Sequence, residues 1–230
     1  MRSTIGIIGS GNIGASVAQA AVAAGHSVVL ANTRGPDSLG GLVARLGERA
    51  RAATPADAAR AGDFVLVAVP FFAYRDLPAQ ALTDRIVLDA TNFDPSRDGD
   101  PPTELADGTA TTSELVQREL PGSRVVKVFN TIFAAHITAL ARPRGATDRS
   151  ALPVAGDDEP AKQQVAAFLD SIGWDSVDAG SLHDSWRMAL GTPAFVAPYL
   201  ALGDFARLAE DPGKPAAAAD IESLLIAAAR

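Results

Sequence analysis

Short apolar runs that alternate with alanine-rich segments constrain the fold of this chain more than any other feature of its sequence. Seven runs have the length of a strand, at 4–8, 27–31, 64–69, 86–89, 124–128, 152–155 and 174–177. The segments between them have the length of a helix, at 12–24, 38–49, 55–61, 72–82, 112–119, 131–141 and 159–172. Because strands that are apolar on both faces need helices on both sides, the alternation predicts an α/β fold with a Rossmann-like, doubly wound parallel sheet.

The alternation stops near residue 180, and we divide the chain there. We expect residues 1–180 to form one Rossmann-like domain and residues 181–230 to form a short helical C-terminal extension. The extension is too short for a separate domain, so it is expected to cap the sheet or to contact a second copy of the chain in a homodimer. The polar segment 94–110, rich in proline and glycine, predicts an exposed loop.

The composition excludes several classes of function. A net charge of -7 argues against a nucleic-acid-binding face, which needs clustered lysine and arginine. The chain has no cysteine and three histidines, so we expect no metal site. No apolar run reaches about 18 residues, and the first residues lack the apolar region of a signal peptide. We therefore expect a cytoplasmic protein with no membrane partner.

A glycine-rich turn follows the first predicted strand and opens the first predicted helix. Its glycines have the spacing Gly9-x-Gly11-x-x-Gly14, within the segment IGIIGSGNIG. In a dinucleotide site the first glycine permits the tight turn, the second lets the backbone approach a pyrophosphate, and the third lets the helix pack on the strand. The backbone N–H groups near Ser10, Asn12 and Ile13 would then face the anion at the helix N-terminus.

The end of the second predicted strand indicates which dinucleotide binds. An NAD site normally has an acidic residue here to hold the ribose 2′-hydroxyl. This chain has Asn32, Thr33 and Arg34 instead, with Ser38 close behind. Arg34 can pair with a 2′-phosphate through charge-assisted hydrogen bonds, and the hydroxyls of Thr33 and Ser38 can add donors. These residues predict NADP(H).

Residues that follow the next three predicted strands are expected to surround the nicotinamide, because the carboxyl ends of parallel strands meet at one edge. These residues are Val69, Pro70 and Phe71, then Ala90, Thr91 and Asn92, then Asn130 and Thr131.

Several motifs together resemble one family. In chain order they are GSGNIG, ANTRG, AVP, DATN, VVKVFNTIF and VAGDD, and they span roughly residues 4 to 180. The sequence resembles the NADP-dependent oxidoreductases of coenzyme F-420, an 8-hydroxy-5-deazaflavin. That family is itself similar to the N-terminal reductase domain of the membrane metalloreductases.

The resemblance implies hydride exchange between NADP(H) and a deazaflavin that stacks against the nicotinamide. It implies that the deazaflavin is bordered by Asn130, Thr131, Ile132, Phe133, Ala134 and Ala135. Because such a coenzyme has an acidic tail, we expect Arg142, Arg144 and Arg149, with Arg187, to form a basic patch for it.

Hydride transfer between two bound rings depends on their positions and needs no side-chain nucleophile. Neither tyrosine has a lysine four residues on, the pair that often donates a proton in carbonyl reduction. His183 and Thr131 are the candidates for an acid–base group. His26, which precedes a predicted strand, is expected to be exposed.

Two other functions stay open at this point. One is NADPH-dependent reduction of a flavin or of a small imine, which for the imine requires a proton donor near the nicotinamide. The other is a non-catalytic NADP sensor, which would leave no room beside the nicotinamide for a second small-molecule substrate.

Overall fold

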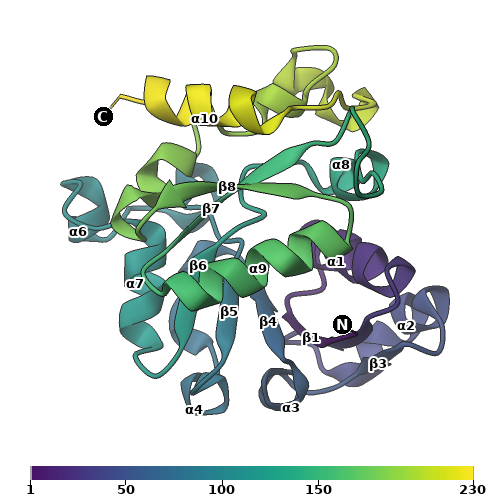
Figure 1. The fold of residues 1–230 in the computed structure, drawn as a ribbon. Helices are drawn as coiled ribbons and strands as arrows, with labels where there is room; N and C mark the ends of the chain where they lie inside the picture. Colours follow the sequence, from purple (N-terminus) through teal and green to yellow (C-terminus); the bar gives the residue numbers. More distant parts are fainter. Residues whose placement is uncertain (1, 230) are drawn as a thin grey trace.

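Eight strands form one sheet in the order β3-β2-β1-β4-β5-β6-β7-β8 in the computed structural model, which describes residues 2–229 (Figure 1). The strands are β1 Thr4–Ile8, β2 Ser27–Ala31, β3 Ala50–Ala52, β4 Phe64–Val67, β5 Ile86–Asp89, β6 Arg124–Lys127, β7 Ala151–Gly156 and β8 Asp175–Gly180. The strands β1 to β6 are parallel to one another, so all six end on one edge of the sheet. The doubly wound α/β architecture is confirmed.

The helices alternate with the strands and cover both faces of the sheet. They are α1 Asn12–Ala23, α2 Gly40–Leu46, α3 Pro55–Ala61, α4 Ala79–Leu82, α5 Pro95–Asp98, α6 Thr103–Ala106, α7 Thr112–Glu119, α8 Ala134–Ala139, α9 Glu159–Ser171 and α10 Ala218–Ala227. Shorter 3-10 turns are η1 Pro36–Leu39, η2 Phe71–Asp76, η3 His183–Met188, η4 Ala197–Tyr199 and η5 Phe205–Glu210. The segment 94–110, expected to be a loop, therefore contains the two one-turn helices α5 and α6.

The sheet is not wholly parallel as predicted, because β7 runs antiparallel to β6, and β8 is parallel to β7. The six-residue α8 is the only α-helix between β6 and β7. The chain re-enters the sheet from the edge at which β6 ends, because the earlier residues of β7 lie beyond Lys127 in the register.

Two local predictions were also wrong. The predicted helix 38–49 is split into η1 and α2, and β3 follows at the sheet edge. The Ala-Arg-Ala sequence of β3 has no apolar run to mark it, and it is held by pairing with β2 alone. The predicted helix 131–141 is shortened to α8, because the residues before it form an irregular connection in which Phe129 has a φ of 65°.

The two larger of the three apolar clusters among residues 2–229 hold most of the helices to the sheet. The larger lies on the side of α1, α8 and α9 and includes Val17, Phe168 and Trp174. The other lies on the side of η2 and α7 and includes Phe71 and Val116. Each fully buried side chain of this size contributes about 1.5–3 kcal/mol to folding, and both clusters fix the strand ends between them.

His26 is buried, contrary to the prediction, with only 3% of its surface exposed. Its Nδ1 accepts a hydrogen bond of 3.1 Å from the Ser3 N–H, and its Nε2 lies 2.9 Å from the Ser171 hydroxyl. The ring packs edge-on against Phe168. Burial lowers the pKa of His26. The histidine therefore ties the chain start to the end of α9.

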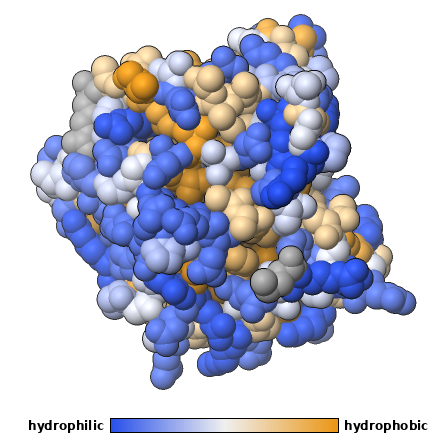
Figure 2. Space-filling view, in the orientation of Figure 1, coloured by the Kyte–Doolittle hydropathy of each residue, from blue (hydrophilic) through white to orange (hydrophobic). Residues whose placement is uncertain are grey.

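The C-terminal segment crosses over the β7–β8 side of the sheet, where α10 packs against both strands (Figure 1). The Tyr199 hydroxyl donates to the Ala151 carbonyl at 2.7 Å, and the Ala151 N–H donates to the Ala216 carbonyl at 2.9 Å. In the same orientation, Figure 2 shows apolar side chains gathered between α10 and the sheet on an otherwise mostly hydrophilic face. Within residues 2–229, no helix has the length and apolar character needed to cross a membrane.

Candidate functional site

The glycine turn after β1 has the geometry that the sequence predicts. Gly9 has a φ of +110°, and a Cβ there would lie 2.2 Å from the Ala68 carbonyl oxygen. A Cβ on Gly14 would lie 1.9 Å from the Gly9 oxygen, so both positions require glycine for packing. A Cβ on Gly11 would instead meet open space within 4 Å. Gly9 and Gly14 are therefore needed for close packing, whereas Gly11 leaves room for a ligand.

The N-terminus of α1 is available to an anion. No side chain of the described residues caps this end, and its first turn contains no acidic residue. The first N–H groups of a helix have no partner within it and carry a partial positive charge. The exposed backbone of Gly11 and Asn12 can therefore hold a phosphate group, which fits the chemistry of a dinucleotide.

The residues after β2 form one polar cluster with the glycine turn. The Asn32 Nδ2 donates to the hydroxyls of Ser10 and Ser38, both at 3.0 Å. The Arg34 N–H donates to the Asn32 Oδ1 at 3.0 Å. Thr33 and Arg34 are exposed. Across the described part of the chain, the Arg34 guanidinium enters no ion pair, so its charge is available for a ligand.

The residues after β4 lie beside the glycine turn. The Val69 side chain comes within 3.2 Å of the position that a Cβ on Gly9 would take. Pro70 precedes η2 and is half-buried. Phe71 is buried instead of flanking a ligand, with its ring stacked on Tyr74 at 4.7 Å and perpendicular to Phe93 at 6.0 Å. Phe71 thus supports the site from behind.

A first cavity, which we call the Asn130 cavity, opens beside the N-terminus of α1 and has a volume of about 270 Å³. It brings together residues predicted for the cofactor with residues predicted for the second substrate. The predicted residues on its wall are Asn12, Ile13, Ala90, Asn92, Asn130, Ile132, Phe133 and Ala134. Thr131 is buried and off this wall, and Ala135 is exposed and also off it.

Backbone strain is concentrated at the Asn130 cavity. Three non-glycine residues in the described range have a positive φ, and two of them, Phe129 at 65° and Val196 at 57°, line this cavity. The Val196 N–H donates to the Thr131 carbonyl at 2.9 Å and so joins the two strained segments. Each such residue costs about 1–3 kcal/mol, and strain of this kind gathers at functional sites.

A second cavity, which we call the Lys127 cavity, lies between α6, the start of α7 and η3 and has a volume of about 600 Å³. Its wall includes Phe93, Leu105, Thr112, Lys127 and Trp186. Asn92 lines both cavities, so they meet at the end of β5.

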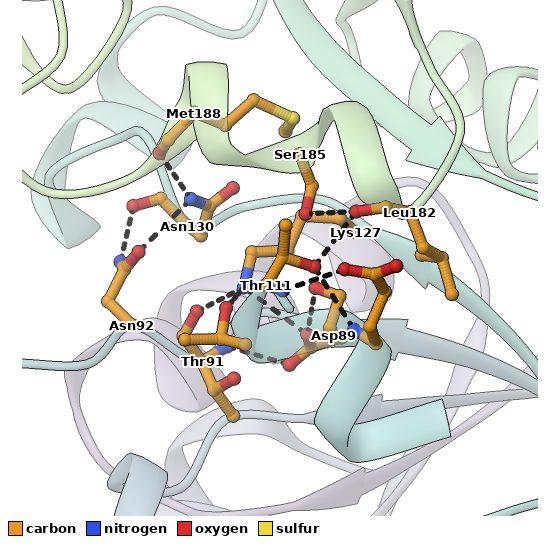
Figure 3. Close-up of polar contacts among 12 residues, drawn as sticks. Asp89, Thr91, Asn92, Thr111, Lys127, Asn130, Leu182, Ser185 and Met188 are labelled. Atoms are coloured by element: carbon orange, nitrogen blue, oxygen red, sulfur yellow. Dashed lines mark hydrogen bonds and ion pairs between the residues drawn. The ribbon is translucent and has the colours of Figure 1, made fainter. Parts of the chain in front are cut away.

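Lys127 and Asp89 form a buried ion pair that the sequence analysis did not identify (Figure 3). They are register partners at the ends of β6 and β5, and the ammonium lies 3.2 Å from the Asp89 Oδ2. The ammonium also donates to the Thr91 carbonyl and to the Thr112 hydroxyl, while Asp89 accepts from the Ser113 hydroxyl and the Thr91 N–H. Burial lowers the pKa of Lys127, and Asp89 opposes that shift. The pair therefore fixes the Thr91 backbone from both sides.

Two asparagine amides join the ends of β5 and β6. The Asn92 Nδ2 donates to the Asn130 carbonyl at 2.7 Å, and the Asn130 Nδ2 donates to the Asn92 Oδ1 at 3.1 Å (Figure 3). The Asn130 Nδ2 also donates to the Met188 carbonyl at 2.7 Å. These bonds fix both amides and attach η3 to the two strand ends.

Two groups predicted near the second substrate lie away from the cavities. The exposed His183 ring is 3.2 Å from the Glu114 carboxylate and lines neither cavity. The predicted basic patch is wrong, because its four arginines form ion pairs within the chain. Arg142 pairs with Asp148, Arg144 with Asp170, and Arg149 with Asp170 and Asp175. Arg187 pairs with Asp184. Arg142 also lies beside the C-terminal half of α1, far from the glycine turn.

Comparison with known proteins agrees with this geometry. Residues 4–93 match the family described as NADP oxidoreductase coenzyme F420-dependent. Over 182 residues the chain is 31% identical to the metalloreductase STEAP3 of Rattus norvegicus. The aligned segment covers 77% of this chain and 34% of that relative. The chain thus spans about a third of the length of that protein.

Two solved structures are similar over most of their length. A hypothetical protein from Sinorhizobium meliloti, SMa0349, is 33% identical with a TM-score of 0.73, over 85% of this chain and 93% of that one. A candidate F420-dependent NADP reductase from Arthrobacter sp. FB24 is 28% identical with a TM-score of 0.67, over 80% of this chain and 87% of that one.

Proposed function

The chain belongs, over residues 4–93, to the family of coenzyme F420-dependent NADP oxidoreductases, and from this premise we propose that it transfers hydride between NADP(H) and a deazaflavin coenzyme, F420. The observation that carries the proposal is the glycine turn, in which Gly11 faces open space at an uncapped helix N-terminus. The unpaired Arg34 at the end of β2 supports NADP(H) as the dinucleotide.

The side chains of this site would bind and orient two rings. Gly11 and Asn12 would hold the pyrophosphate, and Thr33, Arg34 and Ser38 would hold the 2′-phosphate. When bound, the nicotinamide supplies the hydride chemistry, and the protein supplies position and exclusion of water. The strand ends would place the nicotinamide near Val69, Ala90 and Asn92, next to the two cavities.

The cavities favour an enzyme over the two other functions. A non-catalytic sensor needs no space beside the nicotinamide, whereas about 270 Å³ and 600 Å³ open at Asn92. Imine reduction needs a proton donor at the reacting atom, and neither His183 nor Thr131 reaches a cavity wall. A flavin is the remaining alternative substrate. The division at residue 180, the cytoplasmic location and the homodimer stay predictions.

A stopped-flow experiment with the purified protein, NADPH and the oxidised deazaflavin tests the proposal. Flavin mononucleotide and a cyclic imine are run in parallel. We expect fast bleaching of the deazaflavin absorbance. If NADPH is oxidised only in the presence of the flavin or the imine, that compound and not the deazaflavin is the second substrate. NADPH binding with no turnover of any of the three would refute the enzymatic proposal.

The Arg34→Ala variant tests the cofactor. We expect NADPH binding to weaken by about 1.5–3 kcal/mol, the value of a hydrogen bond to a charged group, with NADH binding almost unchanged. Isothermal titration with both dinucleotides measures the difference, and equal weakening of the two would refute the role of Arg34.

A further inference from the structure

The larger of the two cavities lies outside the set of residues expected to hold the second substrate. Apart from Asn92, no residue predicted for either ligand lines the Lys127 cavity. Yet it adjoins the expected nicotinamide position at Asn92 and has more than twice the volume of the Asn130 cavity. Its size and position make it a candidate site for the second substrate.

The walls of the Lys127 cavity suit a flat ring. Trp186 and Phe93 are half-buried on its wall, with Leu105 beside them. The ring of Phe93 is held from behind by the edge-on contact with the buried Phe71. Aromatic side chains fixed in this way favour stacked or edge-on contact with another aromatic ring.

The polar floor of the cavity presents one hydrogen-bond donor. Lys127 lies at the wall, but its three ammonium protons are donated to Asp89, to the Thr91 carbonyl and to the Thr112 hydroxyl, so its N–H groups are not available to a ligand. The Thr112 hydroxyl oxygen accepts from Lys127, and its own proton has no acceptor among residues 2–229. That O–H can donate to an acceptor oxygen of a ligand.

The one carboxylate on the wall is directed to its own turn. The Asp107 Oδ1 accepts from the Thr109 N–H at 3.0 Å and from the Thr109 hydroxyl at 2.6 Å. These bonds lower the pKa of Asp107, which keeps its charge at the exposed rim. The cavity therefore combines an apolar slot, a donor floor and an acidic rim.

We propose that the Lys127 cavity receives the hydride-accepting ring of the second substrate, a planar, uncharged heteroaromatic ring with a carbonyl oxygen directed at the Thr112 hydroxyl. This inference rests on the proposed function. Hydride leaves the nicotinamide C4 and forms a new bond to the ring, so NADPH is oxidised to NADP⁺ and the ring is reduced by two electrons. The negative charge gained by the ring is shared with its carbonyl oxygen, which accepts from the Thr112 hydroxyl, until a proton from water neutralises it.

Binding of oxidised riboflavin, followed by quenching of its fluorescence, tests the site without requiring turnover. Ala106 is an exposed residue on the cavity wall at the end of α6, and a tryptophan there fills the entrance. We expect Ala106→Trp to weaken riboflavin binding at least tenfold and to leave NADPH binding within twofold. Ala139→Trp is the matched control, since Ala139 is exposed at the end of the short helix α8 and lines neither cavity.

A second variant tests the orientation of the ring. Thr112→Val keeps the shape of the side chain and removes the donor, so riboflavin binding should weaken about threefold to tenfold. Binding of phenazine, a tricycle without a carbonyl group, should not change. Equal weakening of both compounds would overturn the recognition of the carbonyl oxygen.

The two proposals fail in different ways. Unchanged riboflavin binding in Ala106→Trp, or no riboflavin binding by the unaltered protein, would overturn the cavity assignment even if NADPH reduces a deazaflavin. Riboflavin binding that Ala106→Trp abolishes, without any hydride transfer from NADPH, would retain the cavity as the ring site and refute the proposed function.

Discussion

Replacing Lys127 by methionine should destabilise the fold strongly, because it leaves the carboxylate of Asp89 buried without its cation. Asp89 is 0% exposed and would keep only the Ser113 hydroxyl and the Thr91 N–H as partners. Removing one partner of a buried ion pair costs about 3–5 kcal/mol. A domain of this kind has a total stability of about 5–15 kcal/mol, so the single variant loses a large fraction of it.

The double variant Lys127→Met/Asp89→Asn separates the charge from the packing. An asparagine keeps the acceptor for the Thr91 N–H and removes the unpaired charge. The Thr91 carbonyl still loses its donor, which costs about 1–3 kcal/mol when the group stays buried. We therefore expect the double variant to regain at least about 2 kcal/mol of the loss.

Urea unfolding followed by circular dichroism measures both variants, with stability taken from the midpoint and the slope. A loss below about 1 kcal/mol in Lys127→Met would show that the site admits water or that Asp89 becomes protonated at little cost. A double variant no more stable than the single one would refute the reasoning on charge.

Further predictions concern the glycine turn and the buried histidine. Gly14→Ala should lower the melting temperature, because the new Cβ would lie 1.9 Å from the Gly9 oxygen. Gly11→Ala should leave the melting temperature unchanged, because its Cβ meets only open space, and should weaken NADPH binding, because the Cβ would occupy the space left for the ligand. Equal melting temperatures in the two variants would contradict this. Because burial lowers the pKa of His26 below that of the unfolded chain, its contribution to stability is present above about pH 6.5 and is lost as the pH falls through the folded pKa. Thermal unfolding between pH 7.5 and 5.5 should therefore show a smaller acid loss in His26→Gln than in the unaltered protein, and parallel curves would refute it.

The sequence predicts the parallel half of the sheet well because each strand there carries its own local signal. The bounds of β1, β2 and β5 match the predicted runs to the residue. A run buried on both faces is apolar throughout and ends where the chain reaches the sheet edge. The strand β3 has no such run, since its middle residue, Arg51, is exposed at the edge.

The glycine turn could be predicted for the same reason, and the ion pair below the Lys127 cavity could not. The spacing of Gly9, Gly11 and Gly14 can be recognised within one short segment of the sequence, although Gly9 packs against Ala68 in the structure. Lys127 and Asp89 stand 38 positions apart and become neighbours only through the register of β5 and β6. A signal was present in the sequence, because a lysine inside an apolar run needs a partner to be buried, and Asp89 ends the preceding run.

The arginine loop failed as a predicted ligand site because loop charges were taken as free. Arg144 and Arg149 pair with Asp170, at the end of α9, which no spacing rule connects to them. Arg149 is itself 7% exposed and reaches the Trp174 carbonyl at 2.8 Å. The guanidinium of Arg149, buried and paired beside the start of β7, is therefore not available to a ligand.

The reversal of β7 does more than change the direction of one strand, because its register brings η3 to the site. Ala155 pairs with Lys127, so the earlier residues of β7 extend past the end of β6. Ala155 also pairs with Gly180 at the end of β8, which places that end level with Lys127. The chain therefore enters η3 beside the strand ends, where Met188 accepts from Asn130 and Trp186 lines the Lys127 cavity.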